Sequence, residues 1–372
     1  MGQHSKIEWC DATFNGWIGC TKVSPACTNC YAERDMAHRR GVVGWGPGEP
    51  RVMTTEDYWR GPEKWARKAH AEGKRLRVFA FSLSDVFDAE NTQVVSFTGK
   101  RPLWWRDGVV GGTAVPDGGP NPCAVVLWDL RIKLFRLIAR TAYALDWLLL
   151  TKRSAVMKAE WPRLERVWVD EVLSPACLAD PRLDAARKFY ARRKEVPNVW
   201  AGVTVENQRA ANERIGDLLS VPVPVSFVSC EPLVGPVDLR KVIPKGHDGT
   251  LDAVGGWLKH DLFYPMGRQT LRKVNWVITG GETGPGCRPA DLDWYRSLRE
   301  QADAAHVPFL FKQHGEFGPA DDAAVACHVA KQDAPTLVTL GTSRLAKVPK
   351  HVAGRVLDGG THDGVPVVDW GA

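Results

Sequence analysis

A recurring order of short apolar runs constrains the fold of this chain more than any other feature. We count six or seven such runs, rich in Val, Phe, Trp and Leu, with helical stretches between them. Runs of this kind are typical of parallel strands that helices cover on both faces, so the sequence predicts an α/β fold, specifically a partial or full (β/α) barrel. The runs are Phe14 to Gly19, Arg77 to Leu83, Asp146 to Leu150, Val199 to Val203, Val225 to Ser229, Asn275 to Thr279 and Pro308 to Phe311.

The segments between these runs indicate where helices and insertions lie. With 372 residues, 44% of them hydrophobic, the chain is long enough for a single barrel with insertions. We predict a barrel domain over residues 1–317, surface insertions near 99–122 and 246–271, and a C-terminal tail over 318–372 that wraps the barrel. Helical patterns cover Thr28 to Arg40, Glu63 to Glu72, Asp129 to Ala144, Gln208 to Leu219 and Leu292 to Ala305.

Composition and charge argue against a membrane protein. No run of 18 uncharged apolar residues occurs, and Met1 to Trp9 contains no hydrophobic stretch of signal-peptide length. We therefore expect a soluble, cytoplasmic protein without membrane partners. The formal net charge of +6 is modest for this length and suits an anionic partner such as a nucleic acid or a nucleotide.

Three of the nine cysteines lie close together. Cys20, Cys27 and Cys30 follow the first predicted strand with the spacing Cys-x6-Cys-x2-Cys, and loops in this position carry the active sites of barrels. Thiolates bind iron–sulfur clusters or zinc, and three of them fill only three corners of a [4Fe–4S] cluster. The fourth iron would be open to S-adenosylmethionine (SAM), which can chelate it and yield a radical after one-electron reduction.

A structural zinc site is the alternative interpretation of these cysteines. Zinc in such a site needs a fourth ligand and usually a second pair of closely spaced ligands. Cys10 and His38 are the nearest side chains of the right type, and neither has that spacing. Although Cys10 could still close a four-thiolate site in space, we favour the open cluster over zinc or a fully ligated cluster, and over cysteines that bind no metal.

A series of ordered motifs covers nearly the whole chain. They read IEWCDATFNGWIGCTKVSPACTNCYAE, FSLSDVFD, LLLTKR, VWAGVTVENQ, SFVSCEPLVGPVDL, WVITGGETGPGCRP, VPFLFKQHGEF and AGRVLDGGTHDGVP. A chain with these motifs resembles the phage Gp37/Gp68 family, a domain of unknown function that is itself similar to divergent radical SAM enzymes. The resemblance implies a barrel of the radical SAM type.

The resemblance also implies that Cys20, Cys27 and Cys30 bind a [4Fe–4S] cluster and that SAM binds beside it. Most radical SAM enzymes have the spacing Cys-x3-Cys-x2-Cys, with an aromatic residue just before the third cysteine. Here the first gap is longer and Asn29 holds the aromatic place. We expect Tyr31, which follows the third cysteine, to make the aromatic contact with the cofactor instead.

Polar side chains follow nearly every predicted strand, as the open face of a barrel requires. The resemblance assigns the group after the second strand to the amino group of SAM, and the groups after the fourth and fifth strands to its ribose hydroxyls. Lys152 or Arg153, after the third strand, suits its carboxylate. We assign no catalytic residue. The predicted cofactor-binding residues are Tyr31, Ser82, Ser84, Asp85, Lys152, Thr204, Glu206, Glu231 and Glu282.

Some weaker features leave two interpretations open. The glycines at 280–281 suit either close approach to an anion or a tight turn. The Trp-Trp-Arg segment at 104–106 suits base stacking or packing. Basic clusters at 39–40 and 192–194 suit phosphate contacts or, as we prefer, solvated helix faces. His314, at a strand end, suits proton transfer or a structural hydrogen bond.

The cysteine loop and the family resemblance together predict a radical SAM enzyme that cleaves SAM reductively and acts on a nucleotide or a nucleic acid. A reductase or other electron donor would be its partner. The alternative is a non-catalytic iron–sulfur or zinc protein that binds nucleic acid or a protein partner. A repair enzyme similar to spore photoproduct lyase would share the cofactor and differ in substrate. No HExxH, GxSxG or phosphate-loop motif supports other chemistry.

Overall fold

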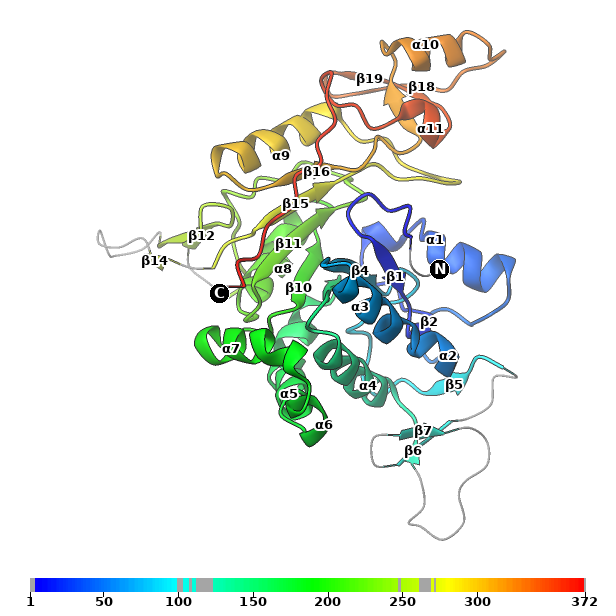
Figure 1. Ribbon diagram of the computed structural model, residues 1–372. Coiled ribbons are helices and arrows are strands. Elements are labelled where there is room, and N and C mark those ends of the chain that lie inside the picture. Colours follow the sequence, from blue (N-terminus) through cyan, green and yellow to red (C-terminus); the bar gives the residue numbers. More distant parts are fainter. Residues whose placement is uncertain are drawn as a thin grey trace.

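A curled parallel sheet of seven strands, in the order β1-β4-β9-β10-β11-β15-β16, forms the centre of the structure (Figure 1). The computed structural model describes residues 4–98, 103–106, 109–111, 123–246, 249–260, 269–270 and 272–370. Every pairing within this sheet is parallel, which requires crossover connections. The prediction of an α/β fold with a partial barrel is therefore confirmed.

Each predicted apolar run overlaps a strand of the sheet, and the ends of every run after the first lie within three residues of the strand's ends. Their apolar side chains are buried on both faces, which is why the runs stand out in the sequence. The strands are β1 (Ala12–Phe14), β4 (Leu76–Ala80), β9 (Leu145–Thr151), β10 (Val199–Thr204), β11 (Val225–Cys230), β15 (Trp276–Thr279) and β16 (Phe309–Phe311).

The first predicted run, Phe14 to Gly19, was wrong in its extent. β1 ends at Phe14, and the chain then leaves the sheet as β2 (Trp17–Ile18), which pairs with β3 (Arg51–Met53). Asn15 fixes this turn, because its side-chain carbonyl accepts a hydrogen bond of 2.8 Å from the backbone N–H of Leu83. The apolar pattern missed the turn because β2 is as buried as β1.

Helices cover the convex face of the sheet. They bury one face against the outward-pointing side chains of the strands and pack against one another as α4 on α5 and α5 on α8. The predicted helix from Thr28 to Arg40 begins later, as α1 (Tyr31–Glu33), and continues as a π-helical segment, Arg34–Arg39. The covering helices are α3 (Gly61–Ala71), α4 (Leu127–Arg140), α5 (Ser154–Val172), α7 (Asp184–Arg193), α8 (Gln208–Leu219) and α9 (Leu292–Ala304).

Successive side chains of each strand point alternately to the helices and to the concave side of the sheet, and aromatic rings fill the concave side. In β10, Val199 and Val203 pack with the helices, whereas Trp200 belongs to an interior cluster with Phe227 and Trp276. The ring centroids of Trp200 and Phe227 each lie 5.9 Å from that of Trp276. This layer forms a floor inside the half-barrel, and residues further along each strand rise above it.

The strands end almost level with one another. Val203 of β10 pairs with Thr151 of β9 and with Val228 of β11, while Thr279 of β15 pairs with Cys230 of β11 and Phe311 of β16. Side chains just beyond these pairs therefore meet at one edge of the sheet. Every second side chain along a strand points to the same face of the sheet. Beyond the aromatic floor, the positions on its face of the sheet include Lys152, Thr204, Ser229, Glu231 and Lys312.

Both predicted insertions lie only partly within the described residues. The first contains a small sheet of β6 (Trp104–Arg106), β7 (Val109–Gly111) and β8 (Cys123–Ala124), and residues 99–102, 107–108 and 112–122 lie outside the description. The side chains of Trp104 to Arg106 also lie outside it, so the base-stacking prediction stays a prediction. The second contains β12 (Gly249–Asp252), β13 (Trp257–His260) and β14 (Gln269–Thr270).

The C-terminal segment forms a small sheet and then returns along the half-barrel (Figure 1). Its strands, in the order β17-β19-β18, are flanked by α10 and α11. Beyond them, the N–H of Gly364 donates to the carbonyl of Phe309 at 2.9 Å, so the returning chain covers the free edge of β16. These elements are β17 (Phe317–Pro319), α10 (Ala323–Val329), β18 (Leu337–Leu340), β19 (Ser343–Lys347) and α11 (Lys350–Ala353).

The remaining described elements are short connections. They are β5 (Val94–Ser96), which pairs with β3, the helices α2 (Glu56–Trp59) and α6 (Pro175–Leu178), and the 3₁₀ helices Pro25–Cys27 and Pro181–Leu183. Within the described ranges, none of the helices has the length and apolar character needed to cross a membrane.

Candidate functional site

A cavity of about 890 Å³ opens at the carboxyl ends of the strands, above the aromatic floor. This volume lies within the range of about 300–1,000 Å³ that is usual for small-molecule and cofactor sites. Of the twelve predicted site residues, Glu206 alone is not part of its wall. The others that line it are Cys20, Cys27, Cys30, Tyr31, Ser82, Ser84, Asp85, Lys152, Thr204, Glu231 and Glu282.

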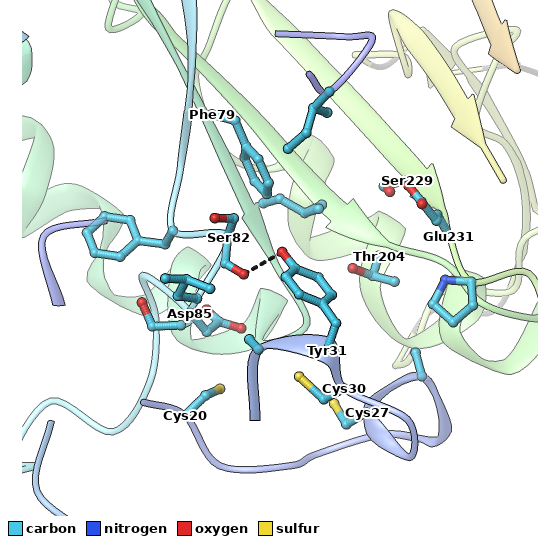
Figure 2. A pocket seen from close by; sticks show the side chains of 18 of the residues that line it. Cys20, Cys27, Cys30, Tyr31, Phe79, Ser82, Asp85, Thr204, Ser229 and Glu231 are labelled. Carbon is cyan, nitrogen blue, oxygen red and sulfur yellow. Dashed lines mark hydrogen bonds between the residues drawn. The ribbon is translucent and has the colours of Figure 1, made fainter. Parts of the chain in front are cut away.

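The three cysteines lie on the loop that connects β2 to α1 and closes one end of the cavity (Figure 2). A 3₁₀ turn, Pro25–Cys27, brings Cys27 close to the start of α1, and Cys30 directly precedes that helix. All three side chains are half-buried. The loop therefore presents three thiols to one space from within eleven residues of sequence.

Buried charges hold the first part of this loop. Arg153, at the end of β9, forms ion pairs with Asp85 at 2.9 Å and Asp88 at 3.0 Å. The same guanidinium donates to the backbone carbonyl of Thr21 at 2.6 Å and lies 3.6 Å from the sulfur of Cys20. Arg153 thus ties the Cys20 end of the loop to the sheet.

A second arginine reaches the loop from β3. Arg51 is almost fully buried, pairs with Asp88 at 2.7 Å and donates to the hydroxyl of Thr21 at 2.7 Å. Arg131 of α4 supports the other side of the network, because it donates to the carbonyl of Val86 and pairs with Glu160. Asp88 and Arg51 were not predicted. Asp88 stands in the FSLSDVFD motif, whereas nothing in the sequence links Arg51 to the cysteines.

A separate set of contacts holds the far part of the loop. Glu282, beyond β15, pairs with Arg288 at 2.6 Å and accepts a hydrogen bond of 3.0 Å from the side chain of Asn29. Arg288 also donates to the carbonyl of Pro25 at 3.1 Å, and Asn29 to that of Gly286 at 2.7 Å. The loop is therefore fixed near Cys27 and Cys30 as well.

Several predicted cofactor contacts are already occupied by protein partners. The Asp85 carboxylate also accepts hydrogen bonds from Thr151 and from the backbone of Lys152. Burial alone would raise its pKa, but the positive charge of Arg153 and these hydrogen bonds lower the pKa below the usual range. Glu206 is buried in an ion pair with Arg214 at 2.6 Å, away from the cavity wall. The carboxylates of Asp85 and Glu206 therefore already have arginine partners within the protein.

Other residues of the cavity wall carry polar groups without a protein partner. The hydroxyl of Thr204 and the side-chain carbonyl of Gln313 are buried and accept or donate no hydrogen bond within the described residues. Lys152 has no carboxylate partner within the same residues, whereas Glu231 pairs with Lys312 at 2.5 Å. Gln313 was not among the predicted site residues, although it follows β16. Buried polar atoms without partners are uncommon and indicate a place for a ligand or water.

Tyr31 rises from the cysteine loop into the cavity (Figure 2). Its hydroxyl donates a hydrogen bond of 2.6 Å to the backbone carbonyl of Ser82, which follows β4. Ser82 and Ser84 make protein contacts as well, Ser82 with Asn15 and Ser84 with the carbonyl of Trp17. The Tyr31 side chain therefore links the cysteine loop to the segment that follows β4.

The thiols of the site differ in acidity. Burial, together with the charges of Asp85 and Asp88, raises the pKa of Cys20 to about 12, although Arg153 opposes this. Burial also acts on Cys27, but the positive charge of Lys152 and hydrogen bonds from the backbone and Ser24 outweigh it and lower the pKa of that thiol. Without a metal, Cys27 is therefore the more easily ionised of the two.

Across the described part of the chain, no group of three or more His, Cys, Asp or Glu side chains is arranged so that it could hold a metal ion. Cys10 and His38, the proposed fourth ligands for zinc, do not line the cavity: Cys10 is buried beside Ser5, and His38 is exposed. A cluster differs from a single ion in that each thiolate binds a different iron.

His314 lies behind the cavity wall and does not line it. Its Nε2 makes a 2.7 Å hydrogen bond with the carbonyl of Val356, and its ring packs against Phe311. These contacts favour the structural interpretation of this histidine. The basic clusters are paired in part, since Arg39 contacts Asp35 and Arg193 contacts Glu195.

We expect His314 to make stability depend on pH. Burial lowers its pKa below the usual 6.5, so the unfolded chain takes up this proton first. The stabilisation is complete above the unfolded pKa and is lost as the pH falls from 6.5 toward the folded pKa. Urea unfolding between about pH 7.5 and about pH 5.5 should show a smaller pH effect for His314→Gln than for the wild type. Equal slopes would contradict this assignment.

The chain belongs to the family described as "Protein of unknown function (DUF5131)", whose model matches residues 4–97 and 124–366. The matched residues include the cysteine loop and every strand of the central sheet. Neither a curated protein nor a solved structure matches the chain. Membership in the family carries no activity with it, so a function has to be argued from the site.

Proposed function

We propose that this member of the DUF5131 family is a radical SAM enzyme that acts on a nucleotide or a nucleic acid. The observation that carries the proposal is the position of Cys20, Cys27 and Cys30 at the carboxyl-end mouth of a parallel half-barrel, beside an 890 Å³ cavity. Within this proposal, the chain is a Gp37/Gp68 protein and its half-barrel is of the radical SAM type.

The donor set fits a cluster with one open corner. The three thiols share one loop, and no fourth cysteine lines the cavity in the described part of the chain. Thiolates are the usual ligands of iron–sulfur clusters. Lys152 lies close enough to Cys27 to influence its ionisation, so a cation stands beside the proposed site. Cys20, Cys27 and Cys30 would hold three corners and leave the fourth to SAM.

When bound, the cluster would pass one electron from an external donor to SAM, giving methionine and a 5′-deoxyadenosyl radical that takes a hydrogen atom from the substrate. The protein's part is to bind and orient the reactants. The Lys152 ammonium suits the methionine carboxylate, and the Thr204 hydroxyl suits a ribose hydroxyl. Tyr31 supplies an aromatic face, held in position by Ser82.

Replacing Thr204 by valine should weaken SAM binding without loss of stability. Thr204 is part of the cavity wall and its buried hydroxyl has no partner within the described residues, so the substitution breaks no hydrogen bond within the protein. We expect about a 2- to 10-fold higher Kd, equivalent to about 0.5–1.5 kcal/mol. Calorimetric titration of SAM into both proteins measures the change, and urea unfolding is the control. An unchanged Kd would remove Thr204 from the SAM site.

The charge of the cavity wall supports an anionic substrate. Lys6, Arg40, Lys152 and Lys350 all line the cavity, and none has a carboxylate partner among the described residues. Unpaired cations around a cavity raise the local concentration of anions, and phosphate groups are such anions. This favours a nucleotide or a nucleic acid over a neutral substrate.

Anaerobic turnover tests the proposal. The protein is reconstituted with iron and sulfide, reduced with dithionite and given SAM, and 5′-deoxyadenosine is measured by mass spectrometry. We expect product from the wild type and none from Cys20→Ala. A stable cluster without product would instead support the non-catalytic iron–sulfur protein, and zinc in place of iron would contradict the proposal.

A further inference from the structure

Arg153 is the side chain that joins the charged network to a cysteine sulfur. One guanidinium nitrogen lies 3.6 Å from the sulfur of Cys20 and 2.9 Å from Asp85, while the other contacts Asp88 and the carbonyl of Thr21. The side chain is about 10% exposed. Its four contacts leave the guanidinium little freedom to turn away from the sulfur.

Arg51 provides a natural comparison in the same network. It is more deeply buried than Arg153, pairs with the same Asp88 and donates a hydrogen bond to the hydroxyl of the same Thr21. Its remaining side-chain hydrogen bonds go to the carbonyls of Gly46 and Glu49. Among the described residues, Arg153 contacts a cysteine sulfur and Arg51 does not. A comparison of substitutions at the two arginines can therefore distinguish support of the cysteine loop from contact with the Cys20 sulfur.

We propose that Arg153 is a positioning residue that fixes the Cys20 corner of the iron–sulfur cluster and raises its reduction potential through an N–H···S hydrogen bond. The inference rests on the proposed function. Reduction adds one electron, and hence one negative charge, to the cluster, and no bond is broken in that step. Hydrogen bonds to the sulfurs stabilise the added charge, and here the donor is a cation. The electron comes from a one-electron reductant, which is dithionite in the experiment below.

Asp85 and Asp88 hold the Arg153 guanidinium in the orientation in which it contacts the Cys20 sulfur. They offset the positive charge of Arg153, so the effect on the sulfur depends on where the N–H points as well as on net charge. Lysine keeps the charge, but a single ammonium cannot reach the sulfur, both carboxylates and the Thr21 carbonyl at once. Arg153→Lys therefore keeps the positive charge but cannot keep all four contacts that the guanidinium makes.

The test compares Arg153→Lys with Arg51→Lys in the reconstituted full-length protein without SAM. Iron content and the midpoint potential from an EPR-monitored dithionite titration are measured for both variants and the wild type. We expect Arg153→Lys to show a lower potential or to retain less iron than the wild type, and Arg51→Lys to show neither change. Urea unfolding serves as control, because both variants should lose stability.

Identical potentials and iron contents in the two variants would overturn the inference. A lowered potential in both would also overturn it, because the effect would then belong to the network and not to the contact with the sulfur. A wild-type protein that binds no cluster would instead contradict the proposed function itself. The failure of the inference and the failure of the proposed function are thus distinguishable.

Discussion

Cys27→Ala is expected to give a folded protein that no longer retains an iron–sulfur cluster. The Cys27 side chain is half-buried on a 3₁₀ turn, and its sulfur interacts with its own loop, through the Ser24 hydroxyl at 3.8 Å and the backbone of Val23 and Ser24. Removing it therefore costs little packing but takes away one of three proposed ligands. Iron should fall from about four per chain to background, and SAM cleavage should fall with it. Iron analysis and the absorbance of the reconstituted proteins measure the loss.

Cys327→Ala is the matched control for this substitution. Cys327 is exposed on α10 and does not line the cavity. This variant should bind the same amount of iron as the wild type and release the same amount of 5′-deoxyadenosine. Full iron content in Cys27→Ala would mean that the cysteine loop is not the cluster site.

Asp88→Asn should destabilise the protein by about 3–5 kcal/mol, the usual cost of removing one partner of a buried ion pair. Asp88 is 2% exposed and is the carboxylate that pairs with the buried Arg51, at 2.7 Å. The substitution leaves that guanidinium without a counter-charge, whereas Arg153 keeps Asp85. The free energy of unfolding in urea measures the effect.

Asp170→Asn provides the comparison for Asp88→Asn. Asp170 pairs with Arg166 at 2.8 Å on the surface of α5, where both side chains are mostly exposed. Exposed pairs contribute little, so this variant should unfold at nearly the wild-type urea concentration. If Asp88→Asn unfolded at the same concentration as Asp170→Asn, the buried network would not support the cysteine loop.

The central sheet could be predicted because each strand is apolar on both faces. Burial between helices and an aromatic interior makes such runs stand out against the polar connections. Helix α5 was not predicted, and Pro162 stands within it, where a proline normally argues for a break. The turn after β1 was missed because Trp17 and Ile18 are buried and apolar like the residues of β1, although they pair with β3 in a smaller sheet.

The candidate site could be predicted as a place but not as a set of contacts. Polar residues at strand ends do meet in one cavity, because the parallel strands end level. Sequence alone cannot distinguish a carboxylate that faces a ligand from one that an arginine holds. Asp85 with Arg153, Glu206 with Arg214 and Glu282 with Arg288 are all held in this way.

The EPR spectrum of the reduced, reconstituted wild-type protein, recorded with and without SAM, tests the proposed site most directly. An open iron beside the cavity predicts a [4Fe–4S] signal that changes when SAM is added and that is absent from Cys27→Ala. A cluster whose spectrum is unaffected by SAM, or a protein that contains zinc and no iron, would contradict the radical SAM assignment.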